Sequence, residues 1–401
     1  MRKVFTVLVR SLFGLLVLTV TLLTAAVLAL RVPAVQTRVV QTLADSVSAR
    51  LGYPVQIGAV DYRWFDELHL DSVRVRDSQQ RPMIEVGRLE VDFKLSSFFA
   101  PIPTDSLVLF GWTVFRYRNY TKLSFGNTIN LDRVRLRRPD VRLVVNSRTG
   151  DLNIDEFIAK IDSITAPKTP SLHPGPDPIF SIAQATVENG TLHYDDPRSV
   201  PINSRDHPVR GTFDYNHFTV HDLNADLSDF LLVADTVAFQ ADNLRGIDRV
   251  ANLRIHELDT HFFFSKKQMR FDALLARVNR SVIRRRVVFR YGHRRDLGDF
   301  NAKVRILADL DSTVVYSEDL ARFSRPLYEY RDVWRASGHM DGLVGDFRFT
   351  KARLFFGKES RAFGTVAFRG LPEFETSTMD FTLKNAVATG PDLEQYVGKN
   401  T

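Results

Sequence analysis

From position 53 onward, apolar and polar residues alternate in short runs that are separated by Gly, Asn, Asp or Pro. Successive side chains of a strand point to opposite faces, so each run predicts a strand with one apolar face. The clearest runs are LEVDFKL, LDRVRL, PDVRLVV, NLRIHEL, DFRF and MDFTLKN. Because the runs are short and no motif returns at a fixed interval, we expect a mainly β fold of antiparallel strands, without a solenoid or propeller repeat.

The segment DELHLDSVRVRD, residues 66–77, changes the phase of its alternation. Its two leucines occupy even positions and its two valines odd ones, so a regular strand would turn the pairs to opposite faces. A bulge or tight turn at Asp71–Ser72 would instead bend the sheet. We predict that break, and a common concave face for Leu68, Leu70, Val73 and Val75. VRLRRPDVRL and VENGTLHYDD have a similar form, which predicts a strand, a turn and a second strand in each.

Helical spacing occurs in three places. After Pro33, apolar residues recur at every fourth position as far as Gly52, which predicts an amphipathic helix over 32–52. NIDEFIAKIDSI, which begins at Asn153, has the apolar spacing of a helix, and SEDLARF predicts one further turn or two. The segment 166–180 contains five prolines and predicts a loop or linker.

The first thirty residues carry a separate signal. An uncharged stretch over 11–30 follows Arg2, Lys3 and Arg10, and Arg31 closes it. A helix of about 20 residues spans about 30 Å, the thickness of a bilayer core, whereas a cleaved signal peptide has an apolar region of only about 7–15 residues. We therefore expect an uncleaved single-pass anchor, and the basic start predicts that the N-terminus is cytoplasmic (N-in).

Composition narrows the chemistry further. The 401 residues are 44% hydrophobic and include 30 phenylalanines but no cysteine, which excludes disulfides and thiolate sites. The formal net charge of +7 favours acidic partners or anionic lipid, whereas nucleic acid would require that charge on one face.

No catalytic or nucleotide-binding motif is present in the sequence. His217 and His221 are spaced to share a strand face but have no third ligand nearby, so we interpret them as surface histidines rather than a metal site. Asp195 and Asp196 precede Pro197, which favours a turn over a catalytic carboxylate pair. The sequence therefore predicts that the protein is not an enzyme and holds no cofactor or metal.

Two basic stretches, DRVRLRRPDVRL and RSVIRRRVVFRYGHRR, interleave arginine with apolar residues. Three interpretations are open: an outer sheet face in water, a rim that contacts anionic lipid headgroups, and a nucleic-acid site. The last lacks a matching motif, so we expect no nucleic-acid partner. The headgroup-contact candidates are Arg284, Arg285 and Arg286.

Several stretches, in this order, resemble the AsmA-like family, in particular the amino-terminal portion of its translocation and assembly module (TamB) branch. A basic start, one span and a short helix lead into GYPVQIGAV and LHLDSVRVRD, which are similar to the strand-forming start of family members. VRLRRPDVRLVVNSRTGDLNIDEFI and ATVENGTLHYDD resemble its strand pairs. LGDFNAKVRILADLDSTVVYSEDLARF and AFGTVAFRGLPEFETSTMDFTLKNA resemble the repeat region, so the resemblance covers nearly the whole chain.

The resemblance implies an elongated, curled antiparallel sheet with an open apolar groove (a β-taco), anchored in the inner membrane of a Gram-negative bacterium with its bulk in the periplasm. It implies phospholipid transport to the outer membrane, and support of protein assembly and secretion there. The implied partners are phospholipid acyl chains, the inner membrane and an outer-membrane barrel of the BamA/TamA type. The family's barrel-contacting domain has no counterpart in this sequence, so the groove region is expected to be incomplete at its C-terminus.

The expected organisation is a cytoplasmic tip and transmembrane anchor (1–31), an amphipathic helix (32–52), an AsmA-like β region with a short helix (53–165), the Pro-rich linker (166–180) and a TamB-like β-groove region (181–401). The residues expected to line the groove are Leu68, Leu70, Val73, Val75, Leu89, Val91, Phe93, Leu192, Tyr194, Phe347, Phe349, Phe381 and Leu383.

A second interpretation is an anchored scaffold whose sheets form closed sandwiches and bind another envelope protein. In a sandwich, a second sheet of the chain itself covers the apolar face, whereas acyl chains would cover it in a lipid conduit. The two interpretations therefore differ in whether the apolar face of the sheet is open.

Overall fold

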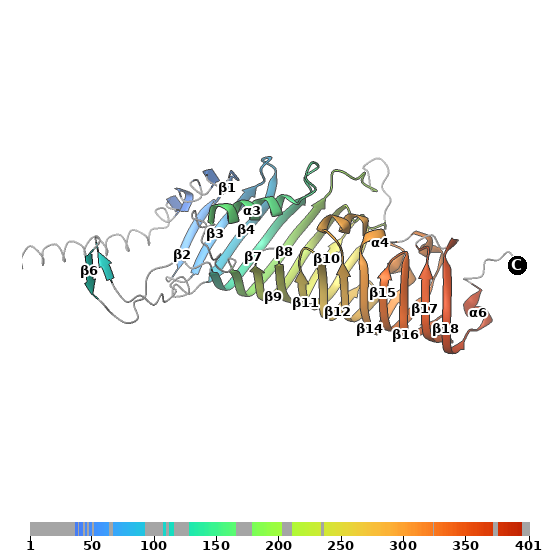
Figure 1. Ribbon diagram of the computed structural model, residues 1–401. Helices are drawn as coiled ribbons and strands as arrows, with labels where there is room; N and C mark the ends of the chain where they lie inside the picture. Colours follow the sequence, from blue (N-terminus) through green and yellow to red (C-terminus); the bar gives the residue numbers. More distant parts are fainter. Residues whose placement is uncertain are drawn as a thin grey trace, which may run out of the picture.

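In the computed structural model, one large curled sheet forms most of the described chain (Figure 1). The described residues are 52–63, 67–92, 128–165, 179–202, 211–233, 236–323, 325–371 and 376–394, with parts of 37–49 and the short strands β5 (Leu107–Leu109) and β6 (Trp112–Phe115). The fold is mainly β with few short helices, as predicted. The expected anchor over 1–31 lies outside the described residues. Within the described part, no helix has the length and apolar character that a membrane crossing needs.

The sheet has 16 strands, which follow one another along it almost in chain order. The strands are β1 (Val55–Gln56), β2 (Ala59–Arg63), β3 (Glu67–Arg76), β4 (Pro82–Asp92), β7 (Thr128–Val144), β8 (Ile179–Asp195), β9 (His217–Val233), β10 (Thr236–Asp248), β11 (Leu253–Phe264), β12 (Gln268–Val278), β13 (Ser281–Arg290), β14 (Arg305–Tyr316), β15 (Val333–Leu343), β16 (Asp346–Phe356), β17 (Ser360–Arg369) and β18 (Thr378–Val387). The helices are α3 (Asn153–Thr165), η2 (Arg294–Asp299), α4 (Phe300–Lys303), α5 (Ser317–Leu320), η3 (Arg325–Glu329) and α6 (Gly390–Leu393). At a strand spacing of about 4.8 Å, the sheet extends roughly 70 Å.

β7 and β8 pair in parallel, although we expected antiparallel strands throughout. Parallel neighbours need a long crossover connection, and α3, the helix predicted from Asn153, lies in that connection. The other neighbouring strands of this sheet are antiparallel. Strands on both sides of the predicted Pro-rich linker therefore belong to one sheet, and β8 begins at Ile179, inside the range predicted for the linker. Residues 166–178 lie outside the described part.

A line of left-handed residues crosses the sheet from β3 to β17. Most of the strands contain one such residue, and the shifts in strand register lie at the same level of the sheet. We call this line the crease, because a left-handed residue bends a strand and offsets the alternation of its side chains. Its members are Ser72, Arg138, Asn189, Asp222, Asn243, Ala273, Arg285, Ser312, Gly338, Lys351 and Gly364, with φ between 49° and 155°.

The crease accounts for the phase change in DELHLDSVRVRD. Ser72 has φ 56°, and pairing with β4 continues on both sides of it, from Leu70 opposite Leu89 to Val73 opposite Val86. The predicted break is therefore confirmed, as a left-handed residue inside one strand rather than a turn between two strands.

The two related stretches also lie within single strands. VRLRRPDVRL is part of β7 and passes through the crease at Arg138, and VENGTLHYDD enters the crease in β8 at Asn189. The prediction of a strand, a turn and a second strand was wrong for both. One left-handed residue changes the phase of the apolar pattern without reversing the chain, so the pattern alone does not separate a bent strand from a hairpin.

Buried aspartates hold the turns along one long edge of the sheet. Asp248, for example, accepts hydrogen bonds from the backbone N–H groups of Val250 and Ala251 at 2.9 and 2.8 Å. Buried N–H groups need such partners, because leaving them unpaired is costly. The residues of this aspartate rim are Asp77, Asp196, Asp214, Asp248, Asp319, Asp332 and Asp392, each at most 6% exposed. The other long edge, the opposite rim, carries the β11–β12 turn and the β13–β14 connection with η2 and α4.

Side chains from the N-terminal helical residues cover the first edge of the sheet. Thr37 Oγ1 accepts a hydrogen bond from the N–H of Val60 at 3.2 Å, and Ser48 Oγ accepts one from the N–H of Val55 at 2.9 Å. These contacts occupy backbone groups that a free edge strand would present to other chains. The positions within 37–49 that the structure describes are helical, and they fall in the range predicted for the helix over 32–52.

Candidate functional site: an apolar trough

Two rows of apolar side chains follow one face of the sheet as far as β18. In each row, one residue per strand lies beside the residue of the next strand. The first row is Leu131, Ile182, Phe230, Phe239, Phe262, Phe271, Val287, Ala308, Met340, Phe349, Val366 and Phe381. The second row is Phe180, Leu232, Val237, Phe264, Met269, Phe289, Ile306, Gly342, Phe347, Phe368 and Met379.

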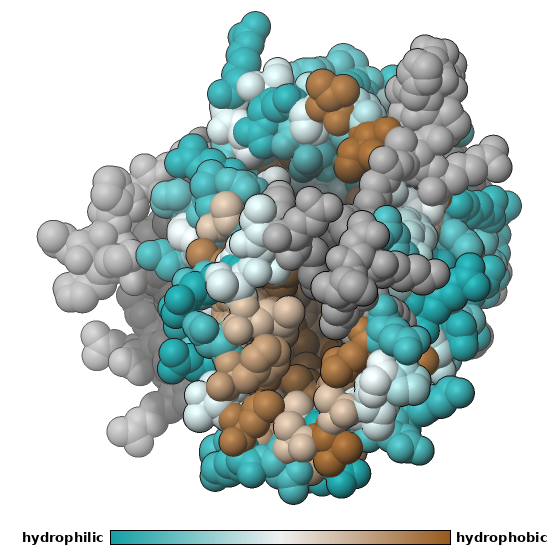
Figure 2. Space-filling model, turned by 90° about the vertical axis from the view of Figure 1, so that its right-hand side faces the viewer, coloured by the Kyte–Doolittle hydropathy of each residue, from teal (hydrophilic) through white to brown (hydrophobic). Residues whose placement is uncertain are grey.

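Figure 2, seen from the β18 end, shows apolar side chains on the hollowed inner side of the curl and hydrophilic ones on its outside. Most residues of the two rows are half-buried rather than buried, because the described residues contain no second large sheet to cover them. We call this open apolar channel the trough. Contiguous apolar surfaces of this extent are typical of binding sites.

Phenylalanine rings form a continuous ladder along the middle of the trough. The distances between ring centroids are 6.1 Å for Phe230 and Phe239, 4.8 Å for Phe239 and Phe262, 5.2 Å for Phe262 and Phe271, and 6.0 Å for Phe271 and Phe289. Aromatic rings attract one another at these separations. The ladder therefore fixes the shape of this wall, and its side chains offer no hydrogen-bonding groups to a ligand.

The predicted lining residues of β3 and β4 lie opposite one another. Leu68 pairs with Val91, and Leu70 pairs with Leu89. Leu89 and Val91 also pack against a buried cluster that contains Val134. Because that cluster includes the first-row residue of β8, these predicted residues are continuous with the trough.

Predicted residues on the other side of the crease form a second group, nearer the aspartate rim. Val75 is only 9% exposed, and Leu192 lies opposite Val220. The ring of Tyr194 stacks on Phe218 with centroids 5.2 Å apart. Burial raises the pKa of Tyr194, as expected for a hydroxyl in apolar surroundings.

At the C-terminal end, the structure places the predicted phenylalanines in the two rows. Phe349 and Phe381 both lie opposite Val366, which is fully buried, in the first row. Phe347 stacks on Phe368 at 4.8 Å in the second row. These residues, which are far apart in the chain, form one surface only because of the strand register.

Another predicted residue, Leu383, lies apart from the rows. Leu383 lies opposite Gly364, at the crease, and Phe93 lies outside the described residues. Most of the phenylalanine ladder was not among the predicted residues. In HFFFS, residues 261–265, three phenylalanines follow one another, so alternation alone does not indicate which of them face the trough.

The outside of the curl is charged, and many of its arginines are paired with carboxylates. Arg135 lies 3.2 Å from Glu90, and Arg286 lies 2.9 Å from Asp272 and 3.8 Å from Asp309. Most arginines of the two basic stretches that belong to strands therefore lie on the outer face of the sheet, and much of their charge is neutralised across strands.

Among the headgroup-contact candidates, Arg286 has these two acidic partners and Arg284 donates to the carbonyl of Ser312 at 2.9 Å. Arg285 is exposed and is part of the crease. The three candidates are thus not equivalent, although they are consecutive in the sequence.

The histidine pair and the aspartate pair make ordinary structural contacts. His217 bonds to Asp195 at 2.8 Å, whereas the ring of His221 faces the ring of His193 at 6.5 Å. Asp196 accepts two hydrogen bonds from the Arg198 guanidinium, which lowers the pKa of Asp196 and fixes the turn that was predicted there. Within the described part of the chain, no group of three metal-binding side chains occurs.

The fold and the trough together define an elongated, open and curled β-sheet with one continuous apolar face. A scan against protein-family models finds no match to this chain, and a search of curated proteins finds no significant match either. The resemblance to the AsmA-like family thus stays a prediction that rests on the order of its sequence motifs.

Proposed function

We propose that the protein is an inner-membrane-anchored carrier of lipid acyl chains, which its trough shields from water on the way to the outer membrane. The observation that carries the proposal is the first row of the trough. Its members are all apolar, occupy neighbouring positions on consecutive strands, and face no second large sheet among the described residues.

The physical argument is the transfer of acyl chains out of water. Each methylene that leaves water gains about 0.8 kcal/mol, so burying most of a long acyl chain in the trough gains roughly 10 kcal/mol. The row itself offers no polar side chain that would penalise an acyl chain, and the charged groups of the outer face stay in water. An apolar channel with a hydrophilic exterior is thus suited to carry lipid between two membranes.

The membrane setting of the proposal rests on the sequence. The uncharged stretch over 11–30 would anchor the chain in the inner membrane, with the bulk of the protein in the periplasm. The resemblance to the AsmA-like family supports a role in phospholipid transport and in protein assembly and secretion at the outer membrane, with a barrel protein as partner. In this proposal the protein acts by shielding and guiding lipid rather than by catalysis.

Site-specific photo-crosslinking tests whether lipid occupies the trough. We expect benzoylphenylalanine in place of Phe262 to crosslink to phospholipid when the full chain is expressed in a Gram-negative bacterium and irradiated, because Phe262 belongs to the first row. Mass spectrometry of the purified protein identifies the adduct.

His261 is the matched control, because it is the adjacent residue of β11, is exposed, and lies opposite Gln240 and Asp272 on the outer face. We expect no phospholipid adduct at this position. A polypeptide adduct at Phe262, with no lipid adduct, would support the interaction-scaffold interpretation instead. Equal lipid adducts at the two positions would show that lipid contacts the protein without entering the trough.

A further inference from the structure

Two connections, one from each rim, meet across the trough. Arg294 of η2, in the β13–β14 connection of the opposite rim, forms an ion pair at 2.7 Å with Asp155 of α3, which follows β7 at the aspartate rim. The two residues are 139 positions apart in the chain. The Arg294 guanidinium also lies 4.7 Å from the ring centre of Phe264, a residue of the second row. This contact is therefore anchored to the inner wall of the trough.

Aromatic rings make a second bridge between the rims. Phe289, on the trough wall, contacts Phe300 of α4 at 5.1 Å, and Phe300 stacks on Tyr215 at 6.1 Å. Tyr215 contacts Phe213 at 5.3 Å, and Phe213 contacts Phe218 of β9 at 5.3 Å. This series of ring contacts thus begins at β13 on one wall of the trough and ends at β9 on the other wall. It passes through α4 and the segment before β9.

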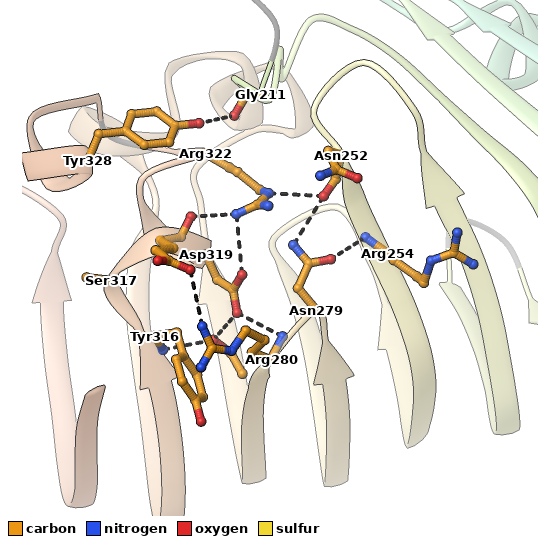
Figure 3. A network of polar contacts seen from close by, with 12 residues as sticks. Gly211, Asn252, Arg254, Asn279, Arg280, Tyr316, Ser317, Asp319, Arg322 and Tyr328 are labelled. Atoms are coloured by element: carbon orange, nitrogen blue, oxygen red, sulfur yellow. Dashed lines mark hydrogen bonds and ion pairs between the residues drawn. The ribbon is translucent and has the colours of Figure 1, made fainter. Parts of the chain in front are cut away.

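The aspartate-rim side of this bridge is held firmly (Figure 3). The Tyr328 hydroxyl donates to the carbonyl of Gly211 at 2.7 Å. The N–H of Phe213 donates to the carbonyl of Arg322 at 2.8 Å. Arg322 also donates to the carbonyl of Asn252 at 3.0 Å, which ties the β14–β15 connection to the β10–β11 turn. Residues 211–216 are therefore fixed to the rim by backbone hydrogen bonds.

The contact between the two connections is of a different kind. Among the described residues, no backbone hydrogen bond joins the β13–β14 connection to residues 211–216 or to α3. In the described part of the chain, the contacts that join the β13–β14 connection to these segments are between side chains, namely the Asp155–Arg294 ion pair and the Phe300–Tyr215 stack. Each side of the bridge is attached to its own rim. The ion pair and the ring stack can therefore separate without breaking a hydrogen bond between strands.

We propose that η2 and α4, together with residues 213–216 and Asp155, form a clasp that closes the trough between β8 and β14 and must open for a lipid to enter or leave this section. The inference rests on the proposed function for its cargo. Lipid in this section is thereby protected from lateral loss, and exchange depends on the separation of two side-chain contacts. Phe300 and Tyr215 determine access in this scheme, because their stack is the junction between the two rims.

A cysteine pair across the clasp tests this proposal, and the absence of native cysteine makes the crosslink specific. A Cβ added at Gly298 would lie 3.7 Å from Asn216 Oδ1, in ordinary contact. We expect the full chain with N216C and G298C, purified in detergent, to form a disulfide under mild oxidation. Release of a pyrene-labelled phospholipid to phosphatidylcholine vesicles should then slow by about tenfold or more, since an open minor state is no longer populated, and reduction should restore it.

The matched control joins T186C and D226C, which replace cross-strand neighbours on the outer face, where Thr186 donates to Asp226 at 3.3 Å. Its oxidation should leave lipid release unchanged. In a separate variant, Y215A should speed release, because it removes the ring between Phe300 and Phe213.

The outcomes separate the clasp from the proposed function. If the N216C and G298C pair fails to crosslink, or if the locked and reduced proteins release lipid equally fast, the clasp is refuted while lipid carriage stands. If the reduced protein takes up no labelled phospholipid, the proposed function is refuted, and the clasp as a lipid gate fails with it.

Discussion

At the scale of single residues, the crease is the unusual feature of the sheet. Left-handed backbone is costly for most residues and easier for Asn, Asp and Gly. Asn189, Asp222 and Asn243 match that preference, but Ala273 and Lys351 do not. The strained positions persist because the strands on both sides remain paired, so the surrounding sheet holds them.

Ala273→Gly tests this strain. A left-handed Ala costs about 1–2 kcal/mol, and Gly loses roughly 0.5–1 kcal/mol more entropy on folding, so we expect a net stabilisation of about 0.5–1 kcal/mol. Ala273 has φ 49° and is exposed, so no packing is lost. The measurement is the free energy of opening of β12 by native-state hydrogen exchange. Ala276→Gly, at a buried position of the same strand with no left-handed backbone, should cost about 1 kcal/mol, and equal losses in both variants would show that Ala273 is unstrained.

Sequence reasoning located one crease residue and missed the rest for a physical reason. In DELHLDSVRVRD, the apolar residues stand at even positions before Ser72 and at odd positions after it, so the change of phase is visible in the sequence alone. Around Ala273 in β12 and Arg285 in β13, the strands carry apolar or charged residues on both faces, so the sequence shows no change in the phase of the apolar pattern. The conformation of these residues depends on their neighbours across the sheet rather than on their own type.

At the scale of elements, the connections on the two rims use different stabilising groups. Buried carboxylates hold the turns of the aspartate rim, whereas the opposite rim includes a buried tyrosine, Tyr291. Its hydroxyl donates to the carbonyl of Ser265 at 2.9 Å, which joins the end of β13 to the β11–β12 turn. Tyr291 is only 5% exposed, and burial raises its pKa to about 12.

The raised pKa makes this junction sensitive to alkali. An unfolded chain loses the Tyr291 proton near pH 10, whereas the folded chain keeps it until about pH 12, so the folded state binds more protons in this window. The stabilisation is therefore complete below pH 10 and is lost as the pH rises toward 12, by about 2–3 kcal/mol at most. Tyr291→Phe should flatten this part of the stability profile, measured by urea unfolding at several pH values. An unchanged profile would contradict the burial of the hydroxyl.

The elements and their mainly antiparallel pairing were largely predictable, whereas the one parallel pair and the strand register were not. The apolar spacing from Asn153 predicted α3, and the alternating runs predicted the strands. The parallel pairing of β7 with β8 was missed, because the residues of a strand do not indicate whether the neighbouring strand runs parallel or antiparallel to it. Most members of the two rows were missed for a related reason, since Phe262 and Phe263 differ in their face only through the register of β11.

At the scale of the whole molecule, the sheet is a linear array. In the described chain, each strand pairs mainly with the strands before and after it, and no hydrophobic core is shared by the two ends. Stability in such arrays is the sum of local terms and neighbour contacts, so distant parts open separately.

Val366→Ala tests this independence. Val366 is fully buried in β17, and its truncation should cost about 2 kcal/mol. Native-state hydrogen exchange should show faster exchange in β16 to β18 and unchanged protection in β8 to β10. Val134→Ala, which truncates a buried residue of β7, should produce the reverse pattern. Loss of protection across the whole sheet in either variant would show that the array unfolds as one cooperative unit.

The crease also has a mechanical consequence. A folded plate is stiff along its fold line and compliant about it, and the crease places such a line along the sheet from β3 to β17, roughly midway between the two rims. We therefore expect the sheet to bend about this line more easily than it shortens along it, so that pulling the rims apart widens the channel without shortening it.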